Sequence, residues 1–283
     1  MNLKKISLVL ITFVLVSILC ISTGMAADEE FIDPDIPESW YEAPQLASEI
    51  GLDEYEQSPM LDKRVEEGEL PPPQERLPED PPVVEPYKEI GRYGGTAVTW
   101  GTELAFNWNS EGWALNPGGR LLRPTPDGQK QTPFLIKDWE YTDDYKTLTI
   151  HLREGLKWSD GHPLTAEDFI FWWEHEAQNE DITPVSPEQW EPVALLDVTS
   201  SDDYTVSFHM SQPNPTQHHG WHVWSDWGPV PAHYAEKYHP DFIGEEEVQK
   251  KAEEEGLISG MNIMGEWYMN LQIIRNMMSR LLF

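Results

Sequence analysis

The sequence predicts a mixed α/β domain. Residues 147–152 alternate polar and apolar side chains with the period of a β-strand, and the turn sequence Asp143–Lys146 separates them from a second strand-like segment, residues 139–141. A helix-start signature at residues 165–168 precedes apolar residues at helical spacing. A hairpin followed by a capped amphipathic helix indicates that a sheet and a helix share one core.

The N-terminus has the layout of a secretory signal peptide, residues 1–27. Two lysines precede an apolar run, Ile6–Ile21, and small residues follow it. The run is shorter than the ~20 apolar residues that a membrane-spanning helix needs. We therefore expect cleavage after Ala26 or Ala27 and an exported protein, in the periplasm or at the extracellular face of the cytoplasmic membrane. An uncleaved anchor is the alternative.

The single cysteine, Cys20, lies inside the apolar run and is expected to be removed with it. Cleavage for lipid anchoring needs a small residue immediately before the cysteine, and this chain has Leu19 there. We therefore expect a mature protein without disulfides, thiol nucleophiles or thiolate metal sites.

The charge balance excludes one class of function. The chain has 50 acidic and 19 basic residues, which gives a formal net charge of −31. A surface this acidic repels phosphate backbones, so nucleic acid is not an expected partner. The charge carries no information about which small ligand the protein binds.

Residues 28–90, which we call the strap, are acidic and rich in proline, as in Leu70–Pro73 and Leu77–Pro82. Composition alone indicates a flexible or extended linker. However, short islands such as Met60–Val65 are compatible with a helical turn, and prolines can hold an extended chain against a domain surface. Both interpretations of the strap are open on composition.

Four strands are expected after Gly91. Residues 96–100 are expected to form the first strand, and the hairpin at residues 139–152 follows it. A further strand is expected at Tyr204–Phe208, after a turn at Ser201–Asp203.

Three helices are expected. The first begins at Thr165, where a capping hydroxyl stands three residues before an acid, and runs to about Glu180. Two shorter helices are expected at Ala232–Lys237 and Glu245–Glu255, the latter with acids in its first turn. The inward face of the first helix is expected to carry Phe169, Trp172, Trp173 and Ala177.

The stretch Leu152–Phe169, LREGLKWSDGHPLTAEDF, resembles the signature of the bacterial extracellular solute-binding proteins of family 5, the dipeptide- and oligopeptide-binding type. The resemblance extends from about residue 58 to Glu255. Within the signature, glycines turn the chain, an aspartate bonds its own turn and a threonine caps the helix. Structural roles, without ligand contact, are expected for Gly155, Asp160, Gly161, Pro163, Thr165, Ala166 and Asp168.

The resemblance implies a periplasmic-binding-protein-like α/β fold of the class II type, in which two lobes close around a ligand. Residues 91–256 would supply most of the first lobe. Long members of the family have strap-like segments before the first strand, which favours an ordered strap here. The implied function is the substrate-binding component of an ABC importer: a monomer that binds oligopeptides, docks on a membrane permease, and has neither cofactor nor enzymatic activity.

Some relatives of this type bind oligosaccharides or nickel. The chain contains 13 tryptophans, and aromatic faces of this kind stack on sugars. An oligosaccharide is therefore the alternative ligand.

The chain departs from the family pattern in length and in its tail. Family members are roughly twice as long, and their second lobe contributes much of the ligand site. Residues 257–283 are rich in methionine and contain one acid, Glu266. A frameshift or a premature stop would give such a tail, and an apolar terminal helix is the alternative. A truncated fragment without a working site is therefore a further hypothesis.

Two segments carry the candidate ligand contacts. One follows the strand expected at residues 96–100, and the other is residues 221–227. Polar groups there would orient a ligand while tryptophan faces stack on it, and core packing is the alternative role for each residue. The candidates are Glu103, Asn107, Trp108, Trp221, Trp224 and Trp227.

Two histidine-containing segments bear on metal chemistry. His175–Asn179 nearly matches the zinc-protease helix, but that motif needs a second histidine where this chain has an asparagine. His218, His219 and His222 form a denser cluster, for which a solvated loop is the preferred interpretation. We therefore predict neither a metal site nor catalytic residues, and a secreted metal-dependent hydrolase is the weak alternative.

Overall fold

A computed structural model describes residues 35–94, 121–179, 183, 185, 187–189, 193–220 and 229–254. The chain divides into two compact units, Met1–Ile36 and Pro37–Phe283, and all the elements below belong to the second. The predicted signal peptide, the predicted strand at residues 96–100 and the tail at residues 257–283 lie outside the described residues. Within those residues, no helix is both long and apolar enough to cross a membrane.

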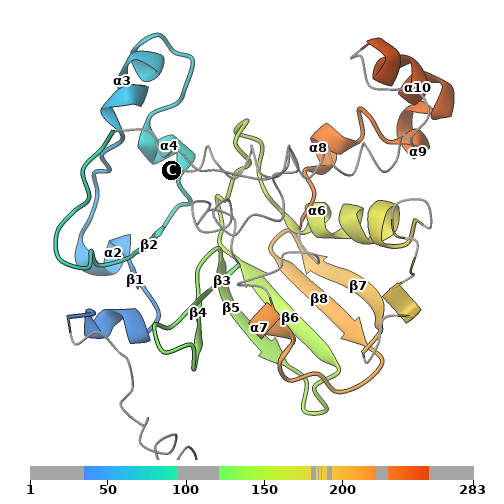
Figure 1. The fold of residues 1–283 in the computed structure, drawn as a ribbon, viewed down its shortest axis with the longest axis horizontal. Coiled ribbons are helices and arrows are strands. Elements are labelled where there is room, and N and C mark those ends of the chain that lie inside the picture. The colour runs from blue at the N-terminus through green and yellow to red at the C-terminus, as the bar shows by residue number, and fades with distance from the viewer. Residues whose placement is uncertain are drawn as a thin grey trace, which may run out of the picture. The chain divides into compact units, whose positions relative to one another are not determined.

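The centre of the second unit is a four-stranded antiparallel sheet (Figure 1). Its strands are β5 (Ile136–Tyr141), β6 (Thr147–Leu152), β7 (Leu195–Asp202) and β8 (Thr205–Met210), in the order β5-β6-β8-β7. The predicted hairpin is confirmed, since β5 pairs with β6. The strand predicted from Tyr204 is also confirmed as β8. The turn predicted at Ser201–Asp203 comes too early, because β7 continues through Asp202.

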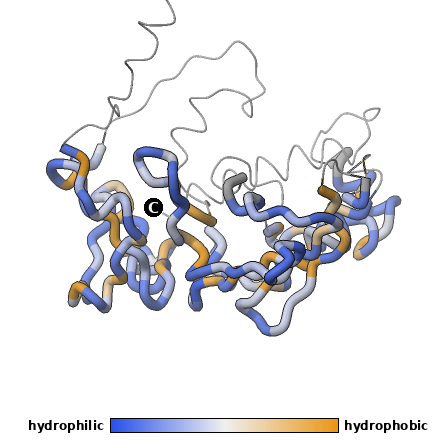
Figure 2. The backbone as a smooth tube through the Cα atoms, turned by 90° about the horizontal axis from the view of Figure 1, so that it is seen from below, coloured by the Kyte–Doolittle hydropathy of each residue, from blue (hydrophilic) through white to orange (hydrophobic). Residues whose placement is uncertain are grey.

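The alternation along the two central strands separates a buried face from a polar face. Leu148, Ile150 and Leu152 on β6 are buried, as are Val206 and Phe208 on β8. The opposite face carries hydroxyl and imidazole groups that pair across the strands. The Oγ1 atom of Thr149 lies 2.9 Å from the Oγ atom of Ser207, for example. Figure 2 shows how hydrophobic and hydrophilic residues are distributed along the backbone.

One helical segment contributes to the core beside the sheet. It consists of α6 (Ala166–Phe171) and the π-helical turn η2 (Trp172–Ala177). The predicted inward face is confirmed, because Phe169, Trp172, Trp173 and Ala177 are all buried in the same cluster as the sheet. The predicted end near Glu180 was too late. The helix ends at Ala177, where the carbonyl of Glu176 accepts hydrogen bonds from downstream Asn179 N and Thr183 Oγ1.

Short helices complete the C-terminal part of the described chain. They are η3 (Pro187–Gln189), α7 (Gln217–Gly220), α8 (Ala232–Ala235), α9 (Pro240–Ile243) and α10 (Glu245–Glu254). The predicted helix at Ala232–Lys237 is shorter than expected, and the one at Glu245–Glu255 matches α10 within one residue. The helix α9 was not predicted.

The strap contains short regular elements over its described part. These are η1 (Glu38–Tyr41), β1 (Gln45–Leu46), α2 (Ala47–Ile50), α3 (Pro59–Glu66), α4 (Pro73–Arg76) and β2 (Pro82–Val83). The helical turn expected at Met60–Val65 is confirmed by α3. β1 pairs with β2, and the carboxylate of Asp80 accepts hydrogen bonds from the backbone and hydroxyl of Ser48.

The strap contacts the domain that follows it at several points. In the domain, β3 (Leu122–Pro124) and β4 (Gln131–Pro133) form a small antiparallel pair. The guanidinium of Arg123 lies 4.8 Å from the ring centre of Trp40 in the strap. The backbone N–H of Glu79 donates to the carbonyl of Glu154 over 3.3 Å. This last contact brings the strap against Gly155.

We predict that Gly155→Ala lowers the free energy of unfolding by about 2 kcal/mol, because it combines backbone strain with a clash. Gly155 has a φ of 78°, and a Cβ there would lie 3.0 Å from the backbone nitrogen of Glu79. The strap would have to shift away. Urea unfolding measures the loss of stability, and limited trypsin digestion measures the exposure of the strap.

Gly161→Ala is the matched control. Gly161 has a φ of 88°, but a Cβ there would have no heavy atom within 4 Å. This variant should lose about 1 kcal/mol from strain alone and keep the strap protected from trypsin. Equal stability loss and equal digestion rates in the two variants would contradict a close approach of the strap to Gly155.

Candidate functional site

The predicted ligand contacts lie outside the described residues. Glu103, Asn107 and Trp108 belong to residues 95–120, and the three tryptophans at 221, 224 and 227 belong to residues 221–228. The structure does describe the residues that flank the second segment. It therefore shows what holds the chain immediately before and after the predicted tryptophan contacts.

The buried carboxylate of Asp168 holds the chain that follows residues 221–228. Its Oδ1 atom accepts a hydrogen bond from Ala232 N over 3.0 Å, and its backbone carbonyl accepts one from Val230 N over 3.1 Å. Val230 and Ala232 are themselves buried. The start of α8 is therefore fixed on the first turn of α6.

The other oxygen of Asp168 holds the signature segment. Its Oδ2 atom accepts from Thr165 N over 2.9 Å and from the indole Nε1 of Trp158 over 3.1 Å. The predicted helix start is confirmed by this contact, in which the acid reaches back to the residue that precedes the helix. Burial raises the pKa of Asp168, although these N–H donors favour the carboxylate. One side chain thus joins the signature loop, α6 and α8.

A second aspartate of the signature contacts the same region. Asp160 accepts a hydrogen bond from His162 N over 3.0 Å, so it bonds its own turn as predicted. Its other oxygen lies 2.6 Å from Nε2 of His233 on α8, and the rings of His162 and His233 stack with centroids 3.8 Å apart. Burial works to raise the pKa of Asp160, but the hydrogen bonds from the two histidines outweigh it and hold that pKa below its ordinary value.

The chain that precedes residues 221–228 is held by β5. Nδ1 of His218 on α7 lies 3.0 Å from the hydroxyl of Tyr141, and the backbone N–H of His218 donates to the same hydroxyl over 3.3 Å. The rings of His218 and Trp139 lie 5.3 Å apart. His218 is the one member of the predicted histidine cluster whose side chain the structure describes, and its partner is Tyr141. The side chains of His219 and His222 are not among those described.

A shallow groove lies at one end of the sheet, with a cavity volume of about 450 Å³. Its wall mixes one lysine with three acids, whereas ligand pockets are mostly apolar with a few polar groups. We therefore do not place the ligand site there. The lining residues are Lys137, His151, Leu152, Glu154, Asp202, Asp203, Tyr204 and Thr205.

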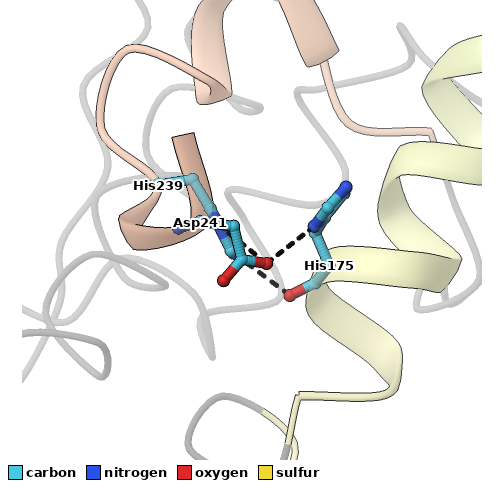
Figure 3. A group of neighbouring side chains, drawn as sticks. All are labelled: His175, His239 and Asp241. Carbon is cyan, nitrogen blue, oxygen red and sulfur yellow. Dashed lines mark hydrogen bonds and ion pairs between the residues drawn. The ribbon is translucent and has the colours of Figure 1, made fainter. Parts of the chain in front are cut away.

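A cluster of two histidines and an aspartate, which we call the His175 cluster, lies between η2 and α9 (Figure 3). Nδ1 of His175 lies 2.9 Å from Oδ2 of Asp241, and Nδ1 of His239 lies 3.6 Å from the same oxygen. His239 is fully buried, whereas Asp241 is half-exposed. The cluster thus connects the end of the long helical segment with α9.

The hydrogen bonds of His239 define its tautomer. Its Nε2 atom lies 3.2 Å from the backbone carbonyl of His175, which can only accept. Its Nδ1 atom lies 3.2 Å from Asp241 N, which can only donate. His239 therefore carries its proton on Nε2 and presents a lone pair at Nδ1, on the side of the Asp241 carboxylate. It also acts as the N-cap of α9.

We predict that the free energy of unfolding falls as the pH drops below 6.5, in part through His239. Burial lowers the pKa of His239 from its ordinary 6.5, so the unfolded chain takes up a proton before the folded chain does. Stability from this group is complete above 6.5 and is lost as the pH falls through the lower folded pKa, by at most about 1.4 kcal/mol per pH unit. Urea unfolding at about pH 7.5 and about pH 5.5 measures the change.

His239→Asn is the matched variant for this prediction. Asparagine retains an N-cap acceptor for Asp241 N but cannot titrate in this range. The variant should therefore lose less stability than the unmodified chain on acidification. An equal loss in both proteins would show that His239 does not cause the pH dependence.

Sequence reasoning missed the His175 cluster. The near match to a zinc-protease helix placed the second ligand within the same helix, whereas the partners of His175 come from a segment 64 residues further along the chain. The only local signal was the sequence His239-Pro240-Asp241, a helix start with two potential ligands. That signal does not specify a partner in η2.

Comparison with known proteins relates the chain to a family of binding proteins. A family model for bacterial extracellular solute-binding proteins, family 5 Middle, matches residues 130–269. The periplasmic alpha-galactoside-binding protein of Rhizobium meliloti (strain 1021) is 29% identical over 228 residues, which is 74% of this chain and 33% of that protein.

Two solved structures show the same relationship. An oligopeptide-binding protein OppA superposes with a TM-score of 0.63 and 36% identity, over 82% of this chain and 35% of its own. The binding protein MelB of Agrobacterium fabrum C58, in complex with stachyose, has a TM-score of 0.52 and 27% identity, over 75% of this chain and 35% of its own. The chain spans about a third of the length of these relatives.

Proposed function

Since residues 130–269 belong to the bacterial extracellular solute-binding proteins of family 5, we propose that the chain is part of the substrate-binding component of an ABC importer and that it binds oligopeptides. The observation that carries the peptide assignment is the likeness to an oligopeptide-binding protein, with a TM-score of 0.63 over 82% of this chain. Segments flanking residues 221–228 would form part of the ligand-binding lobe.

The described contacts support binding without catalysis. The two signature aspartates, Asp160 and Asp168, accept hydrogen bonds from backbone and side-chain N–H groups. Carboxylates held in this way position loops, whereas a general base must reach a substrate proton. The family and its relatives are solute-binding proteins, and in our proposal this chain has no enzymatic activity.

The second candidate function is binding of an α-galactoside oligosaccharide. It is favoured by the relative from Rhizobium meliloti, named as an alpha-galactoside-binding protein, and by MelB with its bound stachyose. The 13 tryptophans of the chain suit a sugar, because their faces stack on pyranose rings. The two candidates differ in which contacts dominate: main-chain hydrogen bonds for a peptide, aromatic stacking for a sugar.

Location and partners follow from the proposed function. The relative from Rhizobium meliloti is periplasmic, and we propose that this chain is exported, either to the periplasm or to the extracellular face of the cytoplasmic membrane. We further propose that it acts as a monomer and delivers its ligand to a membrane permease.

Ligand binding by the full 283-residue chain tests the proposal directly. Thermal unfolding and isothermal titration calorimetry are measured with a mixture of tri- to pentapeptides, with raffinose and with stachyose. We expect the peptides to raise the melting temperature, the sugars to leave it unchanged, and chromatography to recover the peptides uncleaved. Trp224→Ala should weaken the binding while Trp40→Ala, in the strap, should not.

Each other result decides against the peptide proposal in a different way. A shift with stachyose alone would favour the oligosaccharide function. Cleaved peptides would indicate a hydrolase. A sharply melting chain that responds to neither ligand would show that these residues lack a working site of their own.

A further inference from the structure

We propose that the His175 cluster binds a transition-metal ion of the zinc class through Nδ1 of His175, Nδ1 of His239 and Oδ2 of Asp241. One ligand atom from each residue lies within 4.8 Å of the other two, and the residues come from η2 and from the start of α9 (Figure 3). Imidazole nitrogens and a carboxylate oxygen are a ligand set that zinc prefers. The ion would join the long helical segment to α9, and this inference does not depend on the proposed transport function.

The distances leave room for an ion after a small adjustment. Ligands about 2.0–2.1 Å from a tetrahedral zinc ion lie about 3.3 Å from one another. The observed separations from Asp241 Oδ2 are 2.9 Å to His175 and 3.6 Å to His239. Each separation is therefore within about half an ångström of the value a zinc site needs.

His239 is oriented as a metal ligand. Metal-binding histidines usually donate their second ring N–H to a carbonyl or carboxylate, which fixes the ring and directs the other nitrogen at the metal. Nε2 of His239 makes this contact with the carbonyl of His175 over 3.2 Å. Burial lowers the pKa of His239, so its ring is neutral and Nδ1 has a lone pair at neutral pH.

Two hydrogen bonds compete with the ion. Nδ1 of His239 accepts a 3.2 Å bond from Asp241 N, and the 2.9 Å contact between His175 and Asp241 places a proton between them. The first bond is long at 3.2 Å, so its loss costs less than that of a shorter bond. The second proton must leave Nδ1 of His175, which the neutral ring allows by carrying its proton on Nε2 instead.

The surroundings suit a three-ligand site with an open position. Aromatic rings of Phe171 and Phe242 lie 4.8 and 4.9 Å from the ring of His175, where they limit access of water. The carboxylate of Asp241 is half-exposed, which leaves an entry path and a place for a water ligand. The net charge of −31 also attracts cations to the surface.

The test measures zinc binding to the full chain by calorimetry and cobalt binding by visible absorption. We expect one ion per chain bound at the His175 cluster at micromolar concentration or tighter, together with the absorption bands of tetrahedral cobalt. His175→Gln and Asp241→Asn should each weaken binding at least tenfold. Zinc should raise the melting temperature of the unmodified chain and should not raise that of either variant.

A triple variant, His218→Gln with His219→Gln and His222→Gln, is the matched control, because it removes the other histidine cluster. It should retain the zinc affinity and the cobalt spectrum. Loss of binding in the triple variant with retention in His175→Gln would overturn the proposal, as would an unmodified chain that binds no ion. His175 and Asp241 are partly exposed, and circular dichroism confirms that a variant without binding is folded.

Discussion

Phe169→Ala is expected to lower the free energy of unfolding by about 3–5 kcal/mol, the range for removing a buried aromatic side chain from a core. Phe169 lies on α6 and is fully buried. Its ring meets that of Phe208 on β8 edge to face, with centroids 6.2 Å apart. The substitution removes this contact and leaves a cavity between the helix and the sheet, which a rigid sheet can fill only in part.

Urea unfolding followed by tryptophan fluorescence measures this loss. Tyr93→Ala is the control, because this aromatic side chain is 56% exposed and its removal should change the free energy of unfolding by less than about 0.5 kcal/mol. A loss below about 1.5 kcal/mol for Phe169→Ala would mean that α6 is not packed on the sheet as described.

The sheet and α6 were predictable because their signals are local. Strict alternation in β6 and the pair Thr165 and Asp168 at the start of α6 can be read within a few residues. The fold class, that of a periplasmic binding protein, is also confirmed by the solved relatives. These predictions needed no knowledge of distant contacts.

The strand β7 was missed because its alternation is interrupted. Its register shifts twice, between Leu195 and Asp197 and between Ser200 and Asp202. Its buried residues, Leu195 and Val198, are therefore three positions apart. A β-bulge inserts one residue and breaks the period of two on which strand recognition depends.

The candidate sites were less predictable than the fold. The His175 cluster is formed by a π-helical turn and a one-turn helix that are distant in the sequence, and neither has a strong sequence signal. The predicted ligand contacts, from Glu103 to Trp227, lie outside the described residues and stay predictions. Asp168 was predicted to have a structural role at the helix start, but its bond to Ala232 has no sequence signal.

Asp168→Ala is expected to lower the free energy of unfolding by about 3 kcal/mol. The carboxylate accepts hydrogen bonds from three N–H groups, those of Thr165, Trp158 and Ala232. Each buried donor left without a partner costs about 1–3 kcal/mol. The total is less than the sum, because burial of the carboxylate is itself unfavourable and raises its pKa. Urea unfolding measures the loss, and amide hydrogen exchange at Ala232 should become faster.

The stability of Asp168→Asn should lie between that of the unmodified chain and that of Asp168→Ala. The amide oxygen can replace one carboxylate oxygen, but the amide nitrogen then faces N–H donors that it cannot accept from. Amide hydrogen exchange at Ala232 should be faster in Asp168→Ala, which has no side-chain acceptor for Ala232 N. An alanine variant as stable as the asparagine variant would contradict the assignment of Asp168 as the acceptor for all three donors.

Comparison of Asp168→Ala with Phe169→Ala separates a role in ligand binding from a role in stability alone. Both side chains lie in the first turn of α6, and the two substitutions are expected to destabilise the chain by similar amounts. Of these two side chains, only that of Asp168 accepts a hydrogen bond from Ala232, which follows the segment with three of the predicted tryptophan contacts. If those tryptophans bind ligand, Asp168→Ala should weaken affinity at a temperature where both variants are folded, and Phe169→Ala should not. Equal affinities would place the ligand contacts elsewhere.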